Sequence, residues 1–193
     1  MTTSTTQIPG YLAGTWTIDP VHTDVSFTVR HMMVSKVRGK FHGVTGTIVT
    51  AADPANSRVE ADIDLSTIDT GNQDRDNHIR SADFFEVETY PQMTFRSTSV
   101  RQEGNDFVVA GELTLHGVTK PVELELEVNG IAKDPYGGTR AGFSAKTQIN
   151  RKDFGITIDM PMDAGGAVVG DKIQVALEIE AVLVQPSPEE LSS

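Results

Sequence analysis

Residues 24–33 read DVSFTVRHMM, and this stretch shows the pattern that decides the fold. Val25, Phe27, Val29, His31 and Met33 occupy every second position, and the polar residues Asp24, Ser26, Thr28 and Arg30 alternate with the first four of them. Alternation with a period of two is typical of a β-strand with one buried face. The stretch therefore predicts a strand that covers an apolar interior on one side.

The same alternation recurs along the chain, in residues 59–66, 107–115, 122–128, 141–149 and 173–183. Further strands are expected at 15–19, 37–49 and 92–101. Several of these segments exceed the usual strand length of about five or six residues. Long strands with one apolar face favour a closed barrel, because closure leaves no exposed edge. We expect an all-β fold with an eight-stranded antiparallel barrel; an open sandwich is the alternative.

Residues 74–85 interrupt the alternation and predict one short α-helix, with acidic residues near its N-terminus. Residues 155–170, with several glycines, are expected to form a long loop. No shift in composition marks a domain boundary. We therefore expect one domain over 14–184, with a flexible N-terminal segment, 1–13, and a flexible C-terminal tail, 185–193.

Composition excludes several classes of function. The chain has 193 residues and a formal net charge of -11, and such an anionic surface argues against nucleic-acid binding and against general attraction to acidic lipids. Without cysteine there are no disulfides and no thiolate nucleophiles. Residues 1–7 show no signal peptide, and no apolar run approaches the ~20 residues of a spanning helix. A cytoplasmic location without stable membrane insertion is expected.

The sequence contains no motif that indicates catalysis. The five histidines lack the spacing of local metal sites, so we expect no catalytic residues, no metal and no cofactor. One alternative stays open, in which His31, His78 and His116 converge from separate strands to bind a metal in an enzyme.

A barrel of eight strands is just wide enough to be filled by its own side chains or to hold one small ligand. A fully packed interior is one alternative; a lumen that binds a ligand is the other. The candidate lumen residues share an apolar character or an inward position: Phe27, Val29, His31, Met33, Phe41, Ile63, Leu65, Phe84, Phe85, Met93, Phe95, Leu113, Leu115, Phe143, Ile149, Phe154, Met160 and Met162.

Several short motifs, in order along the chain, resemble the YceI-like family. They are WTIDPVH at 16–22, VRGKF at 37–41, RDNHIRSADFF at 75–85, PQMTF at 91–95, GELTLHGVTKP at 111–121 and NRKDFG at 150–155. Each motif alone is weak, but the ordered set extends over residues 14–184 and is specific.

The resemblance implies an extended, lipocalin-like barrel that binds a polyisoprenoid or a similar long amphiphile, as a carrier or sequestering protein and not as an enzyme. It also implies a homodimer. The helix and the 155–170 loop would form the mouth, where an anionic or quinone head group would meet Arg75, His78, Arg80 and Arg151. A scavenger of lipophilic antibiotics or fatty amides would use the same lumen. Many family members are periplasmic, whereas residues 1–7 here show no leader.

Overall fold

The computed structural model describes residues 8–32, 34–158 and 169–184. In these residues it contains ten strands: β1 (Gly14–Ile18), β2 (Asp24–His31), β3 (Ser35–Phe41), β4 (Gly43–Thr50), β5 (Arg58–Asp64), β6 (Gln92–Glu103), β7 (Asp106–Leu115), β8 (Val118–Lys133), β9 (Thr139–Asn150) and β10 (Val169–Leu183). One α-helix, α1 (Gln73–Arg80), and three 3-10 turns complete the described part: η1 (Pro54–Asn56), η2 (Leu65–Thr67) and η3 (Arg151–Phe154).

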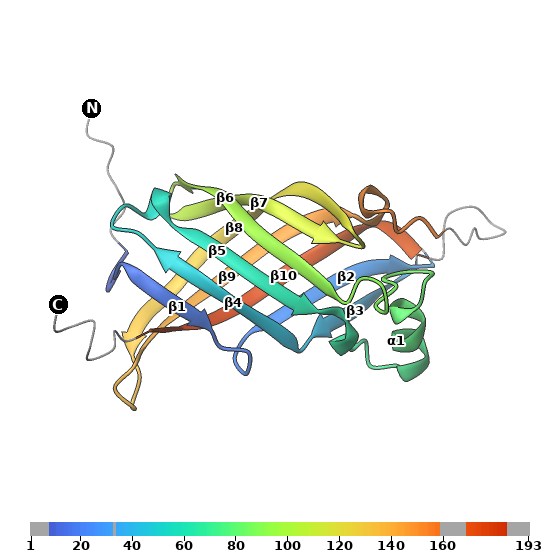
Figure 1. The fold of residues 1–193 in the computed structure, drawn as a ribbon, viewed down its shortest axis with the longest axis horizontal. Helices are drawn as coiled ribbons and strands as arrows, with labels where there is room; N and C mark the ends of the chain where they lie inside the picture. The colour runs from blue at the N-terminus through green and yellow to red at the C-terminus, as the bar shows by residue number, and fades with distance from the viewer. Residues whose placement is uncertain (1–7, 33, 159–168, 185–193) are drawn as a thin grey trace.

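All strand pairings are antiparallel, and the sheet order is β1-β4-β5-β6-β7-β8-β9-β10-β2-β3. A further pairing of β1 with β10 closes eight of these strands into a barrel (Figure 1). The predicted eight-stranded barrel is confirmed, and the sandwich alternative is wrong. Strands in the regions of β2 and β3 were predicted, but not their position as a hairpin that extends the sheet beside the barrel.

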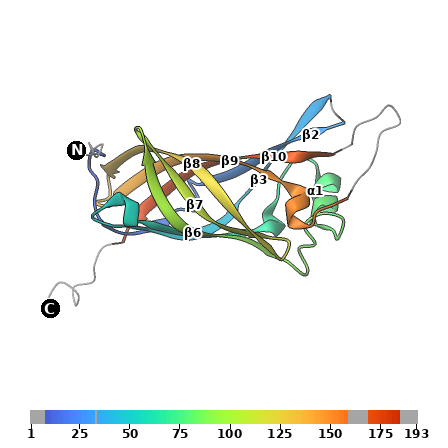
Figure 2. The ribbon, with the colours of Figure 1, turned by 90° about the horizontal axis from the view of Figure 1, so that it is seen from above.

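One edge of strand β10 pairs with both β1, which closes the barrel, and β2, which belongs to the hairpin. Its first part pairs with β2, from Val169 to Glu178, and its last part pairs with β1, from Ala181 to Leu183. The hairpin of β2 and β3 thus continues the wall at the end of the barrel where α1 lies (Figure 2).

The segment 37–49, expected as one strand, is divided between β3 and β4 at His42. Glycine is needed on both sides of this corner. A Cβ on Gly39 would lie 2.4 Å from the ring of Phe27, and one on Gly46 would lie 2.4 Å from the carbonyl oxygen of Glu60. The missing side chain of Gly39 makes room for the Phe27 ring, and that of Gly46 lets β4 lie close to the backbone of β5.

Helix α1 covers one end of the barrel. Its N-cap is Asn72, whose side chain accepts a hydrogen bond from the Arg75 amide at 2.9 Å, and its last turn ends at Ser81. Ile79 packs against the barrel core together with Phe84 and Phe85, which follow the helix in a series of turns. The predicted helix is confirmed, although it is shorter than the 74–85 segment.

The same end of the barrel also contains fully buried side chains. Side chains that are at most 2% exposed meet there from η2, β7 and η3: Leu65, Leu115 and Phe154. No helix in the described residues is long and apolar enough to cross a membrane.

Candidate functional site

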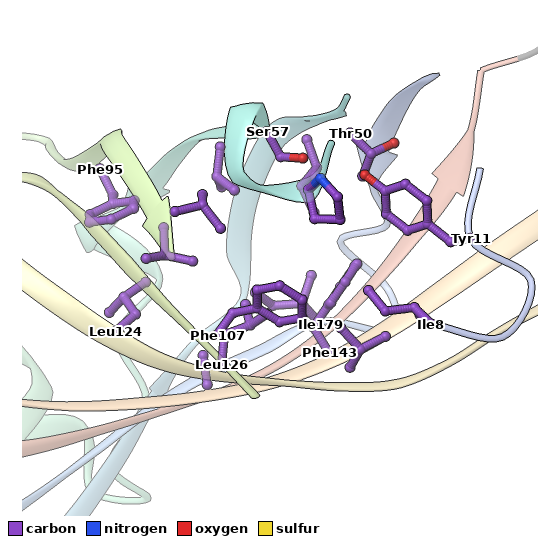
Figure 3. A pocket seen from close by; sticks show the side chains of 17 residues that line it. Ile8, Tyr11, Thr50, Ser57, Phe95, Phe107, Leu124, Leu126, Phe143 and Ile179 are labelled. Atoms are coloured by element: carbon purple, nitrogen blue, oxygen red, sulfur yellow. The ribbon is translucent and has the colours of Figure 1, made fainter. Parts of the chain in front are cut away.

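The interior of the barrel is partly hollow. Two apolar cavities lie along its length, each with a volume of about 90 Å³. The first, here called the N-side cavity, is near η1 and is bordered by the following residues among others: Ile8, Tyr11, Ile48, Phe107, Leu126 and Phe143 (Figure 3). The second, the central cavity, is bordered by a further set: Ile18, Val25, Ile63, Met93, Leu113, Ile149, Val175 and Leu177. A fully packed interior is therefore not what the barrel contains.

The two cavities are neighbours with common walls. Four side chains line both of them: Val59, Phe95, Leu124 and Ile179. Three of these four, all except Phe95, are only partly buried although they point inward, because one side of each faces the hollow. The two apolar cavities are therefore adjacent along the lumen, separated by these shared side chains.

A third cavity, of about 160 Å³, lies between α1 and the hairpin of β2 and β3. Its apolar lining comes from both sides: Phe27, Val29, Ile79, Phe84, Phe85 and Ile173. Five basic or imidazole side chains also border it: Arg30, His31, Arg75, His78 and Arg151. None of the described residues that line this helix cavity is acidic.

Phe41 lies between the central cavity and the helix cavity. Its ring centroid is 5.8 Å from that of Phe27 and 6.0 Å from that of Phe85, and both partners line the helix cavity. On its other side, Phe41 is the register partner of Val25, which lines the central cavity. An aromatic cluster therefore separates the basic end from the apolar lumen.

The cationic residues predicted at the mouth differ in their surroundings. The guanidinium of Arg75 donates to the Thr70 hydroxyl at 2.8 Å and to the Thr70 carbonyl at 2.7 Å, and it borders the helix cavity. His78 also borders this cavity, with Nε2 2.9 Å from Asp83 Oδ2. Arg80 does not; it donates to the carbonyls of Ser66 and Ile68 and so ties α1 to η2.

Arg151 has a structural environment. Only 1% of this residue is exposed, and its five N–H groups have five acceptors: the carbonyls of Ile156, Ile158, Val169 and Gly170, and Asp171 Oδ1. The side chain thereby joins the segment before residue 159 to the start of β10. With its donors occupied, Arg151 has none left for a head group, although it borders the helix cavity.

The structure brings most of the predicted lumen residues to a cavity wall: Phe27, Val29, His31, Phe84 and Phe85 at the helix cavity; Ile63, Met93, Leu113 and Ile149 at the central cavity; Phe143 at the N-side cavity; and Phe95 at both of the last two. Phe41, Leu65, Leu115 and Phe154 are instead buried in the packing around them. Met33, Met160 and Met162 lie outside the described residues.

Several wall residues were absent from the predicted set, above all the inward side chains of β8 and β10: Val122, Leu124, Leu126, Val128, Ile173, Val175, Leu177 and Ile179. The alternation of both strands already indicates their inward direction. Ile8 and Tyr11, by contrast, precede β1 and belong to no periodic pattern.

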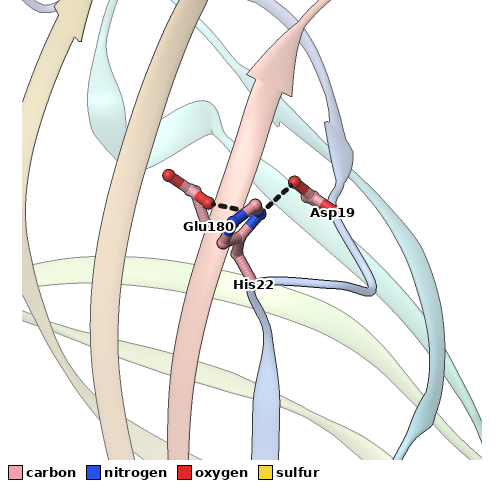
Figure 4. Close-up of side chains that lie close together, drawn as sticks. All are labelled: Asp19, His22 and Glu180. Carbon is pink, nitrogen blue, oxygen red and sulfur yellow. Dashed lines mark hydrogen bonds and ion pairs between the residues drawn. The ribbon is translucent and has the colours of Figure 1, made fainter. Parts of the chain in front are cut away.

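The three histidines of the metal hypothesis are not brought together. His31 and His78 border the helix cavity, but His116 does not; its Nδ1 lies 3.1 Å from the Phe154 carbonyl oxygen and its ring packs on Tyr90. The described residues contain one cluster with suitable ligand atoms within 4.8 Å, formed by Asp19, His22 and Glu180 (Figure 4).

This cluster is an ion-pair network. Arg140 Nη1 lies 2.9 Å from Asp19 Oδ2 and 3.5 Å from Glu180 Oε2, so its guanidinium already provides the cation between the two carboxylates. His22 Nδ1 is 2.7 Å from Asp19 Oδ2 and 3.2 Å from Glu180 Oε2. The network fixes the turn after β1 to β9 and β10.

The network predicts a pH-dependent stability. The hydrogen bond to His22 lowers the pKa of Asp19 to about 2, and the same bond raises the pKa of His22. Asp19 thus stabilises the fold above its unfolded pKa, and this contribution is lost as the pH falls through about 2. His22 stabilises it below its unfolded pKa, and this is lost as the pH rises through the raised value.

We therefore expect His22→Gln to lower the free energy of unfolding most at about pH 5, between the two unfolded pKa values, and less at about pH 9. Urea unfolding of both proteins across the pH range measures the difference. A difference that is the same at every pH would contradict the role of the His22 charge.

Comparison with known proteins shows the family to which the chain belongs. The model of the YceI-like domain matches residues 16–181. The protein YceI of Salmonella newport is 39% identical over 162 residues, which are 83% of this chain and 82% of that protein. YceI of an Escherichia coli O17:K52:H18 strain is 44% identical over 140 residues, 72% of this chain and 73% of that protein.

Solved structures share the architecture. The Campylobacter jejuni YceI protein superposes with a TM-score of 0.68 at 30% identity, covering 81% of this chain and 90% of that one. A polyisoprenoid binding domain from Saccharophagus degradans gives 0.68 at 19% identity over 90% of this chain and all of the domain, a likeness of fold alone. Because the family model covers nearly the whole barrel and curated relatives align over most of their length, the chain belongs to the YceI-like family.

Proposed function

We propose that the protein binds a long amphiphilic lipid of the isoprenoid class inside the barrel, as a carrier or sequestering protein and not as an enzyme. The observation that carries the proposal is the pair of adjacent apolar cavities along the lumen, the N-side and central cavities, with four shared wall residues. Membership of the YceI-like family supports it, as does the fold shared with a domain described as polyisoprenoid-binding.

The apolar walls supply the binding free energy. Each methylene group removed from water contributes about 0.8 kcal/mol, so burial of two isoprene units, ten carbons, contributes on the order of 8 kcal/mol before the cost of ordering the chain. The walls have no charged side chain among the described residues of these two cavities. Such a lumen favours hydrocarbon and offers nothing to a charged head group.

The helix cavity provides the place for a polar or anionic head. Arg75 is the best positioned cation, because Thr70 holds its guanidinium from one side while the residue borders the cavity. His78, His31 and Arg30 add positive or hydrogen-bonding groups at the same site. A prenyl phosphate or a prenyl quinone has both chemistries, and to place its head at the basic end and its tail in the lumen it would displace the Phe27, Phe41 and Phe85 cluster between them.

Native mass spectrometry of the purified full-length chain tests the proposal. We expect an adduct that organic extraction removes, and recovery of a matching mass when the delipidated protein is given a prenyl quinone or a prenyl phosphate. A fatty amide and a lipophilic antibiotic serve as competitors, and tighter binding of either would favour the scavenger alternative. Absence of both a co-purifying lipid and any uptake would refute the proposal. A homodimer and a cytoplasmic location stay predictions.

A further inference from the structure

The hairpin of β2 and β3 carries an exposed apolar tip. Figure 2 shows the hairpin rising away from the barrel at the end where α1 lies. In the turn between the strands Met32 is 41% exposed and Val34 is 86% exposed. Large aliphatic side chains at the end of a projecting hairpin contribute nothing to the core, so their position calls for an external apolar partner.

The flanks of this tip are basic in an otherwise acidic protein. The whole chain has 27 acidic residues, yet residues 25–52 contain none. On the outward face of the hairpin, Arg30 and Lys36 are direct register partners on adjacent strands. Two like charges placed directly opposite each other destabilise a sheet. An anionic partner would remove this repulsion.

A hollow on the same outward face collects these charges. It has a volume of about 470 Å³ and is bordered by Arg30, Lys36 and Lys172. Among the described residues that border it, Asp171 is the one acidic residue, and it is already paired, with Arg151 Nη2 at 3.2 Å and Lys152 Nζ at 3.5 Å. Within the described residues, none of the three cations has an ion-pair partner. The hollow is therefore open to phosphate groups.

We propose that this hairpin docks the protein on an anionic lipid bilayer. Val34 and Met32 enter the head-group region, while Lys36, Lys172 and Arg30 contact the lipid phosphates. Cations on an edge strand also prevent strand-to-strand aggregation, but that purpose does not explain the exposed Val34. An apolar surface with a basic rim is the chemistry by which peripheral proteins bind membranes.

Docking by this hairpin would place the helix cavity at the membrane, because Val29 and Arg30 belong to both. Because the chain as a whole is acidic, an anionic membrane would repel most other orientations, which favours docking by the hairpin. The purpose of docking would be to load or deliver a lipid, and in this respect the inference rests on the proposed function. The docking itself is tested separately, because vesicle binding is measured without a bound lipid.

Flotation with vesicles of phosphatidylcholine, with and without about one-third phosphatidylglycerol, measures the docking. We expect the full chain to bind the anionic vesicles at low salt and to be released at about 0.5 M salt. Each cation near such a surface contributes about fivefold in partitioning. Lys36→Glu combined with Lys172→Glu is therefore expected to weaken binding by about 30-fold or more.

The opposite end of the barrel provides matched controls. Arg58→Glu with Lys133→Glu changes the net charge by the same amount on exposed residues of β5 and β8, and should leave vesicle binding nearly unchanged. Val34→Ser should weaken binding about tenfold, whereas Tyr136→Ser, at a residue 93% exposed in the turn between β8 and β9, should not. Thermal unfolding verifies that each variant is folded.

The proposal is overturned if the protein does not bind anionic vesicles, or if hairpin and control variants bind them equally. It is also overturned if the hairpin variants only dissociate a dimer in sedimentation velocity, since the tip would then be a contact between copies. Uptake of a prenyl quinone should persist in the hairpin variants, because Lys36, Lys172 and Val34 do not border the helix cavity. If the unmodified chain took up no prenyl quinone but still bound anionic vesicles, the proposed function would be refuted and the docking inference would stand.

Discussion

Replacement of Leu124 by tryptophan is expected to weaken the binding of a long prenyl quinone by about 100-fold. Leu124 stands on β8 at the wall shared by the N-side and central cavities, and one side of it faces the hollow. The larger indole would fill space on both sides of the wall between the two cavities and keep a chain from extending across it. A chain that needs both would lose contacts worth about 3 kcal/mol, the burial of roughly four methylene groups.

The length of the ligand distinguishes a blocked lumen from general damage. A ligand with only two isoprene units needs one cavity, so its affinity should fall much less than that of a ligand with eight. The unfolding free energy should fall by no more than about 1–3 kcal/mol, the usual cost of an overpacked interior. Isothermal titration with both ligands, together with urea unfolding, measures the three quantities.

The neighbouring residue provides the control. Glu125 is on the same strand but faces outward, where it makes an exposed ion pair with Lys146 at 3.5 Å. Glu125→Trp therefore adds the same side chain to β8 without entering the lumen and should leave both affinities unchanged. If Leu124→Trp bound the long ligand as tightly as Glu125→Trp does, the ligand would not extend across the two cavities.

The inner face of the barrel could be read from the sequence because strand alternation depends only on local pattern. Phe95, Leu113 and Phe143 were predicted to point inward, and each borders a cavity. Whether the interior is full or hollow could not be read, since the volume left over depends on how side chains from all strands meet. The cavity volume therefore cannot be predicted from the pattern of any single strand.

Which strands pair with β10 could not be predicted from the sequence either. Both β1 and β2 pair with the same edge of β10, at successive positions along it. Their alternation is equally regular, so pattern alone cannot tell the strand that closes the barrel from the strand that extends it. The division at His42 depends on the same long-range geometry, because Gly39 and Gly46 must approach Phe27 and β5.

Arg151 illustrates a further limit. As a cation next to the predicted mouth it was a candidate for contacting a head group, and that hypothesis follows from charge alone. Its acceptors are mostly main-chain carbonyls. Since every residue has such a carbonyl, no side-chain motif marks the site to which the guanidinium binds.

We expect Arg151→Met to lower the free energy of unfolding by about 3–5 kcal/mol, the cost of removing one partner from a buried charged network. The substitution leaves four carbonyls and Asp171 without their donor in a site where only 1% of the residue was exposed. For a chain of this size, the midpoint of thermal unfolding should fall by about 10 °C.

Arg151→Lys separates the structural role from a head-group contact. An ammonium group has three donors on one atom and cannot reach acceptors on both sides as the planar guanidinium does, so the lysine variant should also lose about 2 kcal/mol or more. Lys152→Gln is the matched control, because Lys152 is an exposed neighbour that pairs with the same Asp171 and should contribute at most about 1 kcal/mol. If Arg151→Lys kept full stability but lost affinity for a prenyl phosphate and not for a prenyl quinone, Arg151 would be a ligand for the anionic head. If it lost stability while the affinity per folded molecule was unchanged, the guanidinium would serve to hold the start of β10 against the residues before 159, and Arg75 would remain the cation for the head group.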